Sequence, residues 1–174
     1  EIGEATLQHD CFSYTSVILA CSFGDQWQQA MSMFDEVMDS YIEPNNAIYG
    51  AGIRACESTG PWQWQKAMLL LSAMNGALLE QDILCYTAAI RACGKAGQWK
   101  QSLLLLRGLR EAAMEPDVDS CSAAMAACGK FGDRRQTLAL LSEAGEARLE
   151  LNAFMHTVGI GACSEGQWQV ALSL

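Results

Sequence analysis

The chain has 174 residues, and its composition and charge limit the classes of protein to which it can belong. With 51% hydrophobic and 18% charged residues, it can bury a continuous core, while no apolar run approaches the ~18 residues of a membrane span. The net charge of −9 argues against a uniformly basic nucleic-acid binder, so any such binding needs a locally basic surface.

A repeat with a period of about 35 residues organises the chain. Residues 1–10 form the end of one copy. Complete copies follow at 11–45, 46–82, 83–117 and 118–152, and residues 153–174 begin another. We therefore expect 1–174 to be a single array, and part of a longer one. The copy at 46–82 carries two extra residues around Pro61 and Trp62, which we expect to bulge from a turn.

Each complete copy predicts two helices. In the copy at 83–117, Asp82 is a suitable N-cap, and apolar residues at spacings of three and four predict a helix over 83–95. Gly97 interrupts the pattern, a second helix is predicted over 98–111, and Pro116 ends the connection. Neither helix can bury its apolar stripe alone, so the pairs must stack. The prediction is an all-α fold, an α-solenoid with one concave face.

The cysteines, histidines and glycines give little sign of catalysis or metal binding. One cysteine recurs in each copy, and with no CxxC and only two histidines the sequence lacks a zinc-type ligand set. His9 and His156 are far apart, and the glycines form no phosphate-binding loop. We expect no catalytic residue, no metal, no cofactor and no small-molecule substrate, hence no enzyme activity of this chain. The recurring cysteines are predicted to be buried and reduced: Cys21, Cys56, Cys93, Cys128 and Cys163.

Several positions agree with one known type of repeat. The fourth residue of a copy is Tyr14, Tyr49 or Tyr86, the eighth is Ile18, Ile53, Ile90 or Ile160, and two copies end in Glu-Pro followed by Asn45 or Asp117. With the 35-residue period, this set resembles the pentatricopeptide repeat. The resemblance covers essentially the whole chain and implies a right-handed superhelix. Departures such as Cys121 and Arg134 weaken the copy at 118–152 most.

The resemblance implies sequence-selective binding of single-stranded RNA, one base per repeat. In that scheme the fifth and last residues recognise the base edge, and the second packs against the base face. The base-reading set is then Thr15, Asn45, Gly50, Asp82, Thr87, Asp117, Ser122, Asn152 and Thr157. The base-packing set is Phe12, Ala47, Leu84 and Phe154. A role is implied in RNA processing, stability, editing or translation in a mitochondrion or chloroplast, with other proteins of an RNA-processing complex as further partners.

The pairing of fifth and last residues implies particular bases. Thr or Ser with Asn corresponds to adenine and Thr with Asp to guanine, which gives 5′-A-N-G-A-purine-3′. Gly50 has no side chain with which to select the second base. The Asp and Asn residues are also what helix N-capping requires, a role that is compatible with base contact. The recurrent hydroxyl at the fifth position is harder to explain structurally, because Thr and Ser are mediocre inside helices.

A locally basic face is predicted on the first helices. Helical spacing places the second, fifth, ninth and thirteenth residues together. That face carries four cations that we expect to contact phosphates, although ordinary solvated residues are the alternative: Arg54, Arg91, Lys95 and Lys130. Two rival functions stay open. One is a protein-binding scaffold of the tetratricopeptide kind, and the other is the binding array of a larger enzyme whose catalytic domain lies outside this chain.

Overall fold

The described residues of this computed structural model contain helices and turns and no strand, which confirms the all-α prediction. The structure describes residues 11–24, 26–40, 43–57, 63–79, 81–131, 134–147 and 149–163. The expected bulge at Pro61 and Trp62 lies outside these residues. The helices, in chain order, are α1 Cys11–Phe23, α2 Trp27–Asp39, α3 Asn46–Ala55, α4 Gln63–Gly76, α5 Ile83–Lys95, α6 Trp99–Glu111, α7 Val118–Phe131, α8 Arg134–Glu146 and α9 Ala153–Ala162.

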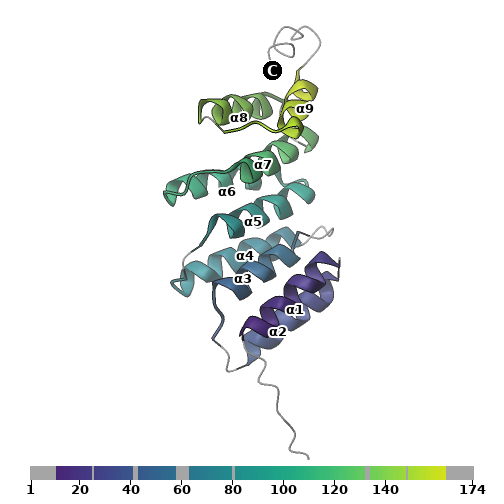
Figure 1. Cartoon of the computed structure of the whole chain (residues 1–174), viewed down its shortest axis with the longest axis vertical. Coiled ribbons are helices and arrows are strands. Elements are labelled where there is room, and N and C mark those ends of the chain that lie inside the picture. The colour runs from purple at the N-terminus through teal and green to yellow at the C-terminus, as the bar shows by residue number, and fades with distance from the viewer. Residues whose placement is uncertain are drawn as a thin grey trace, which may run out of the picture.

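The helices stack as successive pairs along one direction (Figure 1). Each odd-numbered helix packs against its even-numbered partner and against the next odd-numbered helix. Within the part of the chain that the structure describes, the backbones of even-numbered helices come close only to the odd-numbered helices beside them, while side-chain ion pairs join α2 to α4 and α6 to α8. The first helices of the repeats therefore form a continuous layer, and the second helices form an outer layer. This arrangement is the predicted α-solenoid.

Local sequence signals set the helix ends of the repeat at 83–117. α5 spans the predicted residues, and the Asp82 carboxylate caps it by accepting a hydrogen bond from the Cys85 backbone N–H at 2.8 Å. Beyond α5, Gly97 has a φ of +75°, a left-handed conformation that glycine adopts without strain. α6 begins at Trp99, one residue later than predicted, because Gln98 is its N-cap residue.

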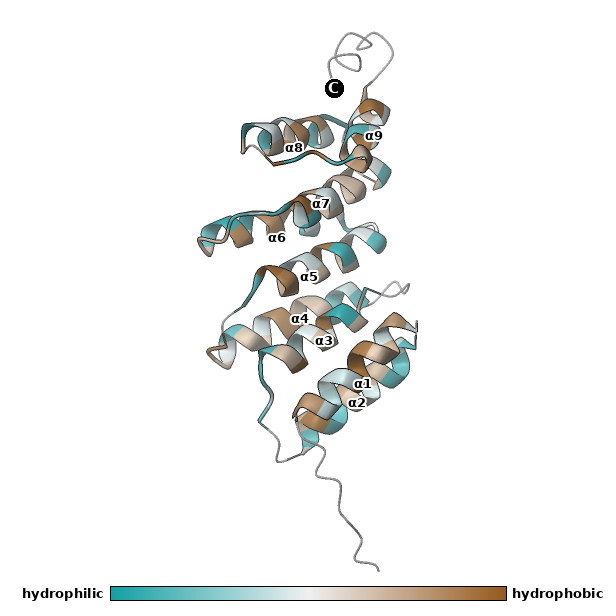
Figure 2. Ribbon diagram, viewed as in Figure 1, coloured by the Kyte–Doolittle hydropathy of each residue, from teal (hydrophilic) through white to brown (hydrophobic). Residues whose placement is uncertain are grey.

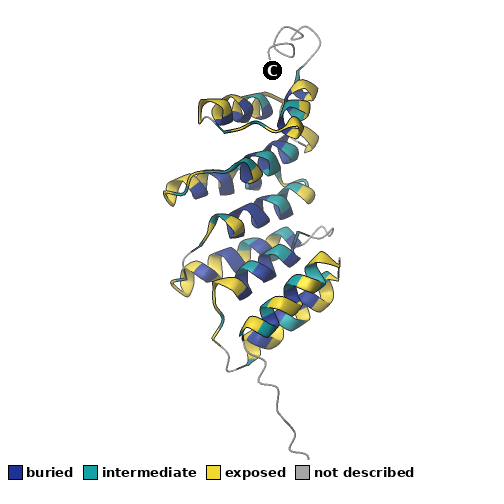
Figure 3. Ribbon diagram, in the orientation of Figure 1, coloured by how far each residue is buried: buried dark blue, intermediate teal, exposed yellow. Residues whose placement is uncertain are grey.

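The core runs through the stack along the predicted stripes, and Figure 3 shows buried residues on every labelled helix. Ile18, Ile53 and Ile90, at the eighth position of their repeats, are fully buried. Hydrophobic and hydrophilic residues are mixed on each helix (Figure 2), as expected when only one side of a helix is covered. Ile160, at the same position of the last repeat, is exposed.

The cysteine prediction is correct for the inner repeats and wrong at the two ends. Cys56, Cys93 and Cys128 are buried, whereas Cys21 and Cys163 are only half-buried, since they lie in the first and last described repeats. All eight cysteines are free thiols. Burial raises the pKa of Cys56 to about 12, so this thiol stays protonated and unreactive at neutral pH.

The other recurring residues mediate helix packing. The small residues near the start of the second helices are fully buried: Ala30, Ala67, Ser102 and Thr137. The tryptophans beside them are partly buried against the core, which agrees with a packing role: Trp27, Trp64 and Trp99. Trp168 and Ala171 lie outside the described residues. Within the described chain, no helix has the length and apolar character needed to cross a membrane.

Candidate nucleic-acid interface

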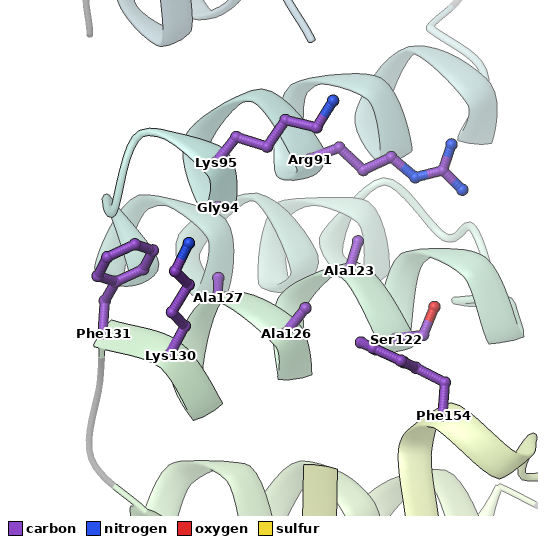
Figure 4. A pocket seen from close by; sticks show the side chains of 10 residues that line it. All are labelled: Arg91, Gly94, Lys95, Ser122, Ala123, Ala126, Ala127, Lys130, Phe131 and Phe154. Atoms are coloured by element: carbon purple, nitrogen blue, oxygen red, sulfur yellow. The ribbon is translucent and has the colours of Figure 1, made fainter. Parts of the chain in front are cut away.

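The first-helix layer carries two hollows, and each brings together several of the predicted site residues. The first lies among α1, α3 and α5, and the predicted residues that line it are Thr15, Ala47, Gly50, Arg54, Asp82 and Leu84. The second lies among α5, α7 and α9. It has small residues along its floor and is lined at its rim by Arg91, Lys95, Ser122, Lys130, Phe131 and Phe154 (Figure 4). Phe12, Asn45, Thr87, Asp117, Asn152 and Thr157 do not line either hollow.

The second residues of the repeats stand out from this layer. Phe12 is 79% exposed, Leu84 is 59% exposed and Phe154 is 49% exposed. Ala47 and Asp119 are also exposed at the equivalent position. Exposure of large apolar side chains to water is unfavourable. Their recurrence along one layer is suited to packing against a flat apolar ligand.

The last residues of the repeats cap the first helices, as expected. Each uses its side-chain Oδ1 to accept a hydrogen bond from a backbone N–H three residues ahead. The distances are 3.1 Å for Asn45, 2.8 Å for Asp82, 2.8 Å for Asp117 and 2.9 Å for Asn152. One polar atom of each side chain is therefore occupied by capping. The second polar atom gives Asn45, Asp117 and Asn152 the capacity for a further contact.

The fifth residues differ in what their hydroxyls do. Those of Thr15 and Thr157 each donate to the backbone carbonyl four residues earlier at 2.7 Å, and that of Ser122 donates to the Asp119 carbonyl at 3.0 Å. Thr87 is only 5% exposed, and its hydroxyl has no hydrogen-bond partner among the described residues. A buried hydroxyl without a partner is unfavourable, so Thr87 is the member of the set with an unused bonding capacity.

Two of the expected cations lie near aromatic rings, and a third lines the second hollow. The Arg54 guanidinium carbon lies 5.6 Å from the centre of the Phe23 ring, and the Lys130 Nζ lies 4.9 Å from the centre of the Phe131 ring. Lys95 lines the second hollow (Figure 4). The sequence analysis did not single out Phe23 and Phe131. Phe23 is the thirteenth residue of its repeat, the position that Lys95 and Lys130 occupy in theirs, and this shared position is the signal that could have found it. Phe131 directly follows Lys130.

Arg91 is held between two carboxylates. One of its nitrogens is 3.9 Å from Glu57 Oε2 and another is 3.6 Å from Asp119 Oδ2. Burial raises the pKa of Glu57, and the nearby charges of Arg91, Lys95 and Arg54 oppose that rise. The layer is thus less basic than its four cations suggest, because Glu57 lies among three of them.

The outer layer has a different character. Its acids pair locally: Arg110 with Glu143 at 2.9 Å, Lys66 with Asp35 at 3.3 Å, and Tyr14 with Glu36 at 2.8 Å. His156 is half-buried, consistent with a packing role. In the described ranges, no group of three His, Cys, Asp or Glu side chains could hold a metal ion.

Comparison with known proteins agrees with the repeat pattern. The sequence model of the pentatricopeptide repeat, described as PPR repeat, matches residues 12–42 and 84–112, which fall in the repeats at 11–45 and 83–117. The chain therefore contains pentatricopeptide repeats. The model does not match the repeats at 46–82 and 118–152, which carry the insertion and most of the departures. No curated protein sequence matches the chain.

Solved structures of pentatricopeptide repeat proteins share the fold. PPR10 in complex with an 18-nt psaJ RNA element superposes with a TM-score of 0.82 at 22% identity, over 94% of this chain and 23% of PPR10. PPR10 from maize gives a TM-score of 0.71 at 19% identity, over 97% of this chain and 24% of that one. The PPR domain of Arabidopsis thaliana protein-only RNase P 1 (PRORP1), in complex with tRNA, gives 0.78 at 11% identity, over 91% of this chain and 82% of that domain. This chain thus spans about a quarter of the length of PPR10.

Proposed function

We propose that this pentatricopeptide repeat chain binds single-stranded RNA along its first-helix layer, one base per repeat. The observation that carries the proposal is the composition of the second hollow. It combines the exposed ring of Phe154, the Ser122 hydroxyl and the cations Lys95 and Lys130 in one place. An exposed apolar ring suits a base, a hydroxyl suits a base edge, and cations suit phosphates.

The related structures support RNA as the ligand class. PPR10 is described in complex with an RNA element and the PRORP1 domain in complex with tRNA. By the same family resemblance, the proposed RNA is a transcript of a mitochondrion or chloroplast, and the proposed role lies in its processing, stability, editing or translation. The base pattern that the reading pairs imply is 5′-A-N-G-A-purine-3′.

We propose that Asp117 recognises the base edge in the repeat at 83–117, because it uses only Oδ1 for capping. The Thr87 hydroxyl is buried and has no partner among the described residues, so a base would reach it only after neighbouring side chains move. Leu84, exposed one turn earlier on the same helix, would pack against the face of that base.

The net charge of −9 is compatible with this proposal because few of the acids lie on the first helices. The cations Arg54, Lys95 and Lys130 lie on the first-helix layer, and most of the acids lie on second helices and connections. Only a few phosphates would be neutralised, so the salt dependence of binding should be shallow compared with that of a strongly basic protein.

Fluorescence anisotropy with labelled RNAs tests the proposal. The chain is titrated with an RNA containing 5′-AAGAA-3′ and with a uridine-only RNA of equal length, at several salt concentrations. We expect tighter binding to the first RNA and a logarithmic salt slope of about −0.7 for each neutralised phosphate. Removing one charge by Lys130→Gln should make the slope shallower by about that amount. A protein-binding scaffold would show no salt-dependent RNA binding.

Lys100→Gln is the matched control for Lys130→Gln. Lys100 is an exposed lysine with its Nζ 5.5 Å from the centre of the Trp99 ring, and it belongs to α6 in the outer layer. The substitution removes the same charge from the chain without touching the proposed interface. Equal effects of Lys100→Gln and Lys130→Gln would mean that the net charge, and not the first-helix layer, governs binding, and would reject the proposed surface.

A further inference from the structure

We propose that the Arg91 guanidinium supplies the stacking surface for the base bound by the repeat at 118–152. This inference rests on the proposed RNA binding and assigns Arg91 a role that differs from phosphate contact. The repeat at 118–152 lacks the apolar second residue of its neighbours, and Arg91 of the preceding repeat lies beside that position.

The missing feature is an apolar second residue. Leu84 and Phe154 occupy this position in the repeats before and after, and both are largely exposed on the first-helix layer. The repeat at 118–152 has Asp119 instead, with a side chain that is 68% exposed. A carboxylate offers no apolar face to a base, and its charge repels the phosphates of RNA. Without a substitute, the base at this repeat would be packed on the Phe154 side alone.

Arg91 lies where the substitute is needed. Its guanidinium is 3.6 Å from Asp119 Oδ2, and Arg91 lines the same hollow as Ser122 and Phe154. Figure 4 shows the Arg91 side chain extending toward the end of the hollow where Ser122 and Phe154 lie, while Lys130 and Phe131 lie at the other end. A base placed against the Ser122 hydroxyl would therefore have Phe154 on one side and Arg91 on the other.

The two acids beside Arg91 favour stacking over phosphate contact. Glu57 Oε2 at 3.9 Å and Asp119 Oδ2 at 3.6 Å offset the positive charge and limit the orientations of the guanidinium. An arginine whose charge is already offset attracts a phosphate less strongly, but its plane keeps its ability to stack on a base. The Arg91 side chain is 38% exposed, so its plane is accessible.

Arg91→Lys separates the two roles, because lysine keeps the charge and loses the planar group. Binding of the wild type and of Arg91→Lys is measured with RNA containing 5′-AAGAA-3′ and with the same RNA abasic at the fourth nucleotide. We expect Arg91→Lys to weaken binding to the intact RNA by about tenfold, the scale of one stacking contact. The two proteins should bind the abasic RNA equally, and the salt slope should not change.

Two further variants complete the experiment. Asp119→Leu restores an apolar second residue, so in this background the effect of Arg91→Lys should fall below about threefold. Arg110→Lys is the control for the exchange itself, because Arg110 pairs with Glu143 at 2.9 Å in the outer layer and should leave RNA binding unchanged. Circular dichroism melting verifies that every variant is folded.

The possible results are distinguishable. An equal loss on intact and abasic RNA would show that Arg91 contacts phosphate and would overturn the inference, leaving the proposed RNA binding in place. Unchanged binding of Arg91→Lys to the intact RNA would overturn it in the same way. Absence of RNA binding by the wild type would reject the proposed function and this inference together.

Discussion

The repeats at 83–117 and 118–152 have the same fold but different surfaces. Their eighth residues, Ile90 and Met125, are both fully buried. Their second residues are Leu84 and Asp119, and their second helices begin with Trp99 and Arg134. The family sequence model matches the first of these repeats and not the second, although both form the same helix pair. Both repeats keep the buried stripe and form the same helix pair, whereas the second residue and the first residue of the second helix differ between them.

The largest predicted effect tests whether the buried stripes of the repeats at 83–117 and 118–152 contribute equally to stability. Ile90→Ala and Met125→Ala each remove a fully buried side chain and leave a cavity, so each should lower the free energy of unfolding by about 2–5 kcal/mol. Urea denaturation followed by circular dichroism measures both values. A cost below about 1 kcal/mol for Met125→Ala would show that the repeat at 118–152 packs more loosely than its neighbour.

The next effect concerns base selectivity in the repeat at 83–117. Asp117→Asn exchanges an acceptor for an amide that also donates, and should move the preference at the third base from guanine to adenine. The change should correspond to about 1–3 kcal/mol in competition binding between RNAs that differ only at that base. Asn also caps helices, so stability should be nearly unchanged. Equal affinity for the two RNAs before and after the substitution would show that Asp117 is a cap only.

A smaller pair of effects should have opposite signs in the two repeats. The Ser102 hydroxyl is buried and donates to the Ile90 carbonyl at 3.1 Å, so Ser102→Ala should destabilise the fold by about 1 kcal/mol. Thr137, at the equivalent position, is fully buried, and its hydroxyl has no partner among the described residues. Thr137→Val should therefore stabilise the fold by about 1 kcal/mol. Thermal melts of the two variants should shift in opposite directions, and a destabilising Thr137→Val would contradict this account.

The smallest effect concerns Glu57, which pairs with Arg91 across consecutive repeats. Burial raises the pKa of Glu57 on folding, so the folded chain binds this proton more tightly than the unfolded chain does. Stability therefore falls as the pH rises from below the ordinary glutamate pKa of about 4.3 through the raised pKa. Glu57→Gln should stabilise the fold at neutral pH, and this gain should disappear as the pH is lowered toward 4, in melts recorded across that range.

Glu57→Gln also bears on the proposed interface. It removes a negative charge from among Arg54, Arg91 and Lys95, so RNA binding at neutral pH should tighten. Asp35→Asn is a suitable control, because Asp35 pairs with Lys66 in the outer layer. A stability gain that persists unchanged at low pH would show that the Glu57 charge is not its source.

The sequence by itself determined the period, the helix pairs and the caps, because these depend on interactions over a few residues. The spacing of Tyr86, Ile90 and Cys93 defines one stripe of α5, and Asp82 caps the same helix through a contact three residues away. The exposure of Phe12, Leu84 and Phe154 also follows from the sequence, since the second position of each repeat lies off that stripe.

The tertiary structure alone decided what happens where one repeat meets the next. Arg91 lies between Glu57 of the preceding repeat and Asp119 of the following one, although these residues are far apart in sequence. Thr87 is buried, whereas the fifth residues of the other repeats are not. Ile160 is exposed, whereas Ile18, Ile53 and Ile90 at the same position are buried. Periodicity specifies which side of a helix is covered. The side chains that the neighbouring repeat presents there are set by packing between repeats.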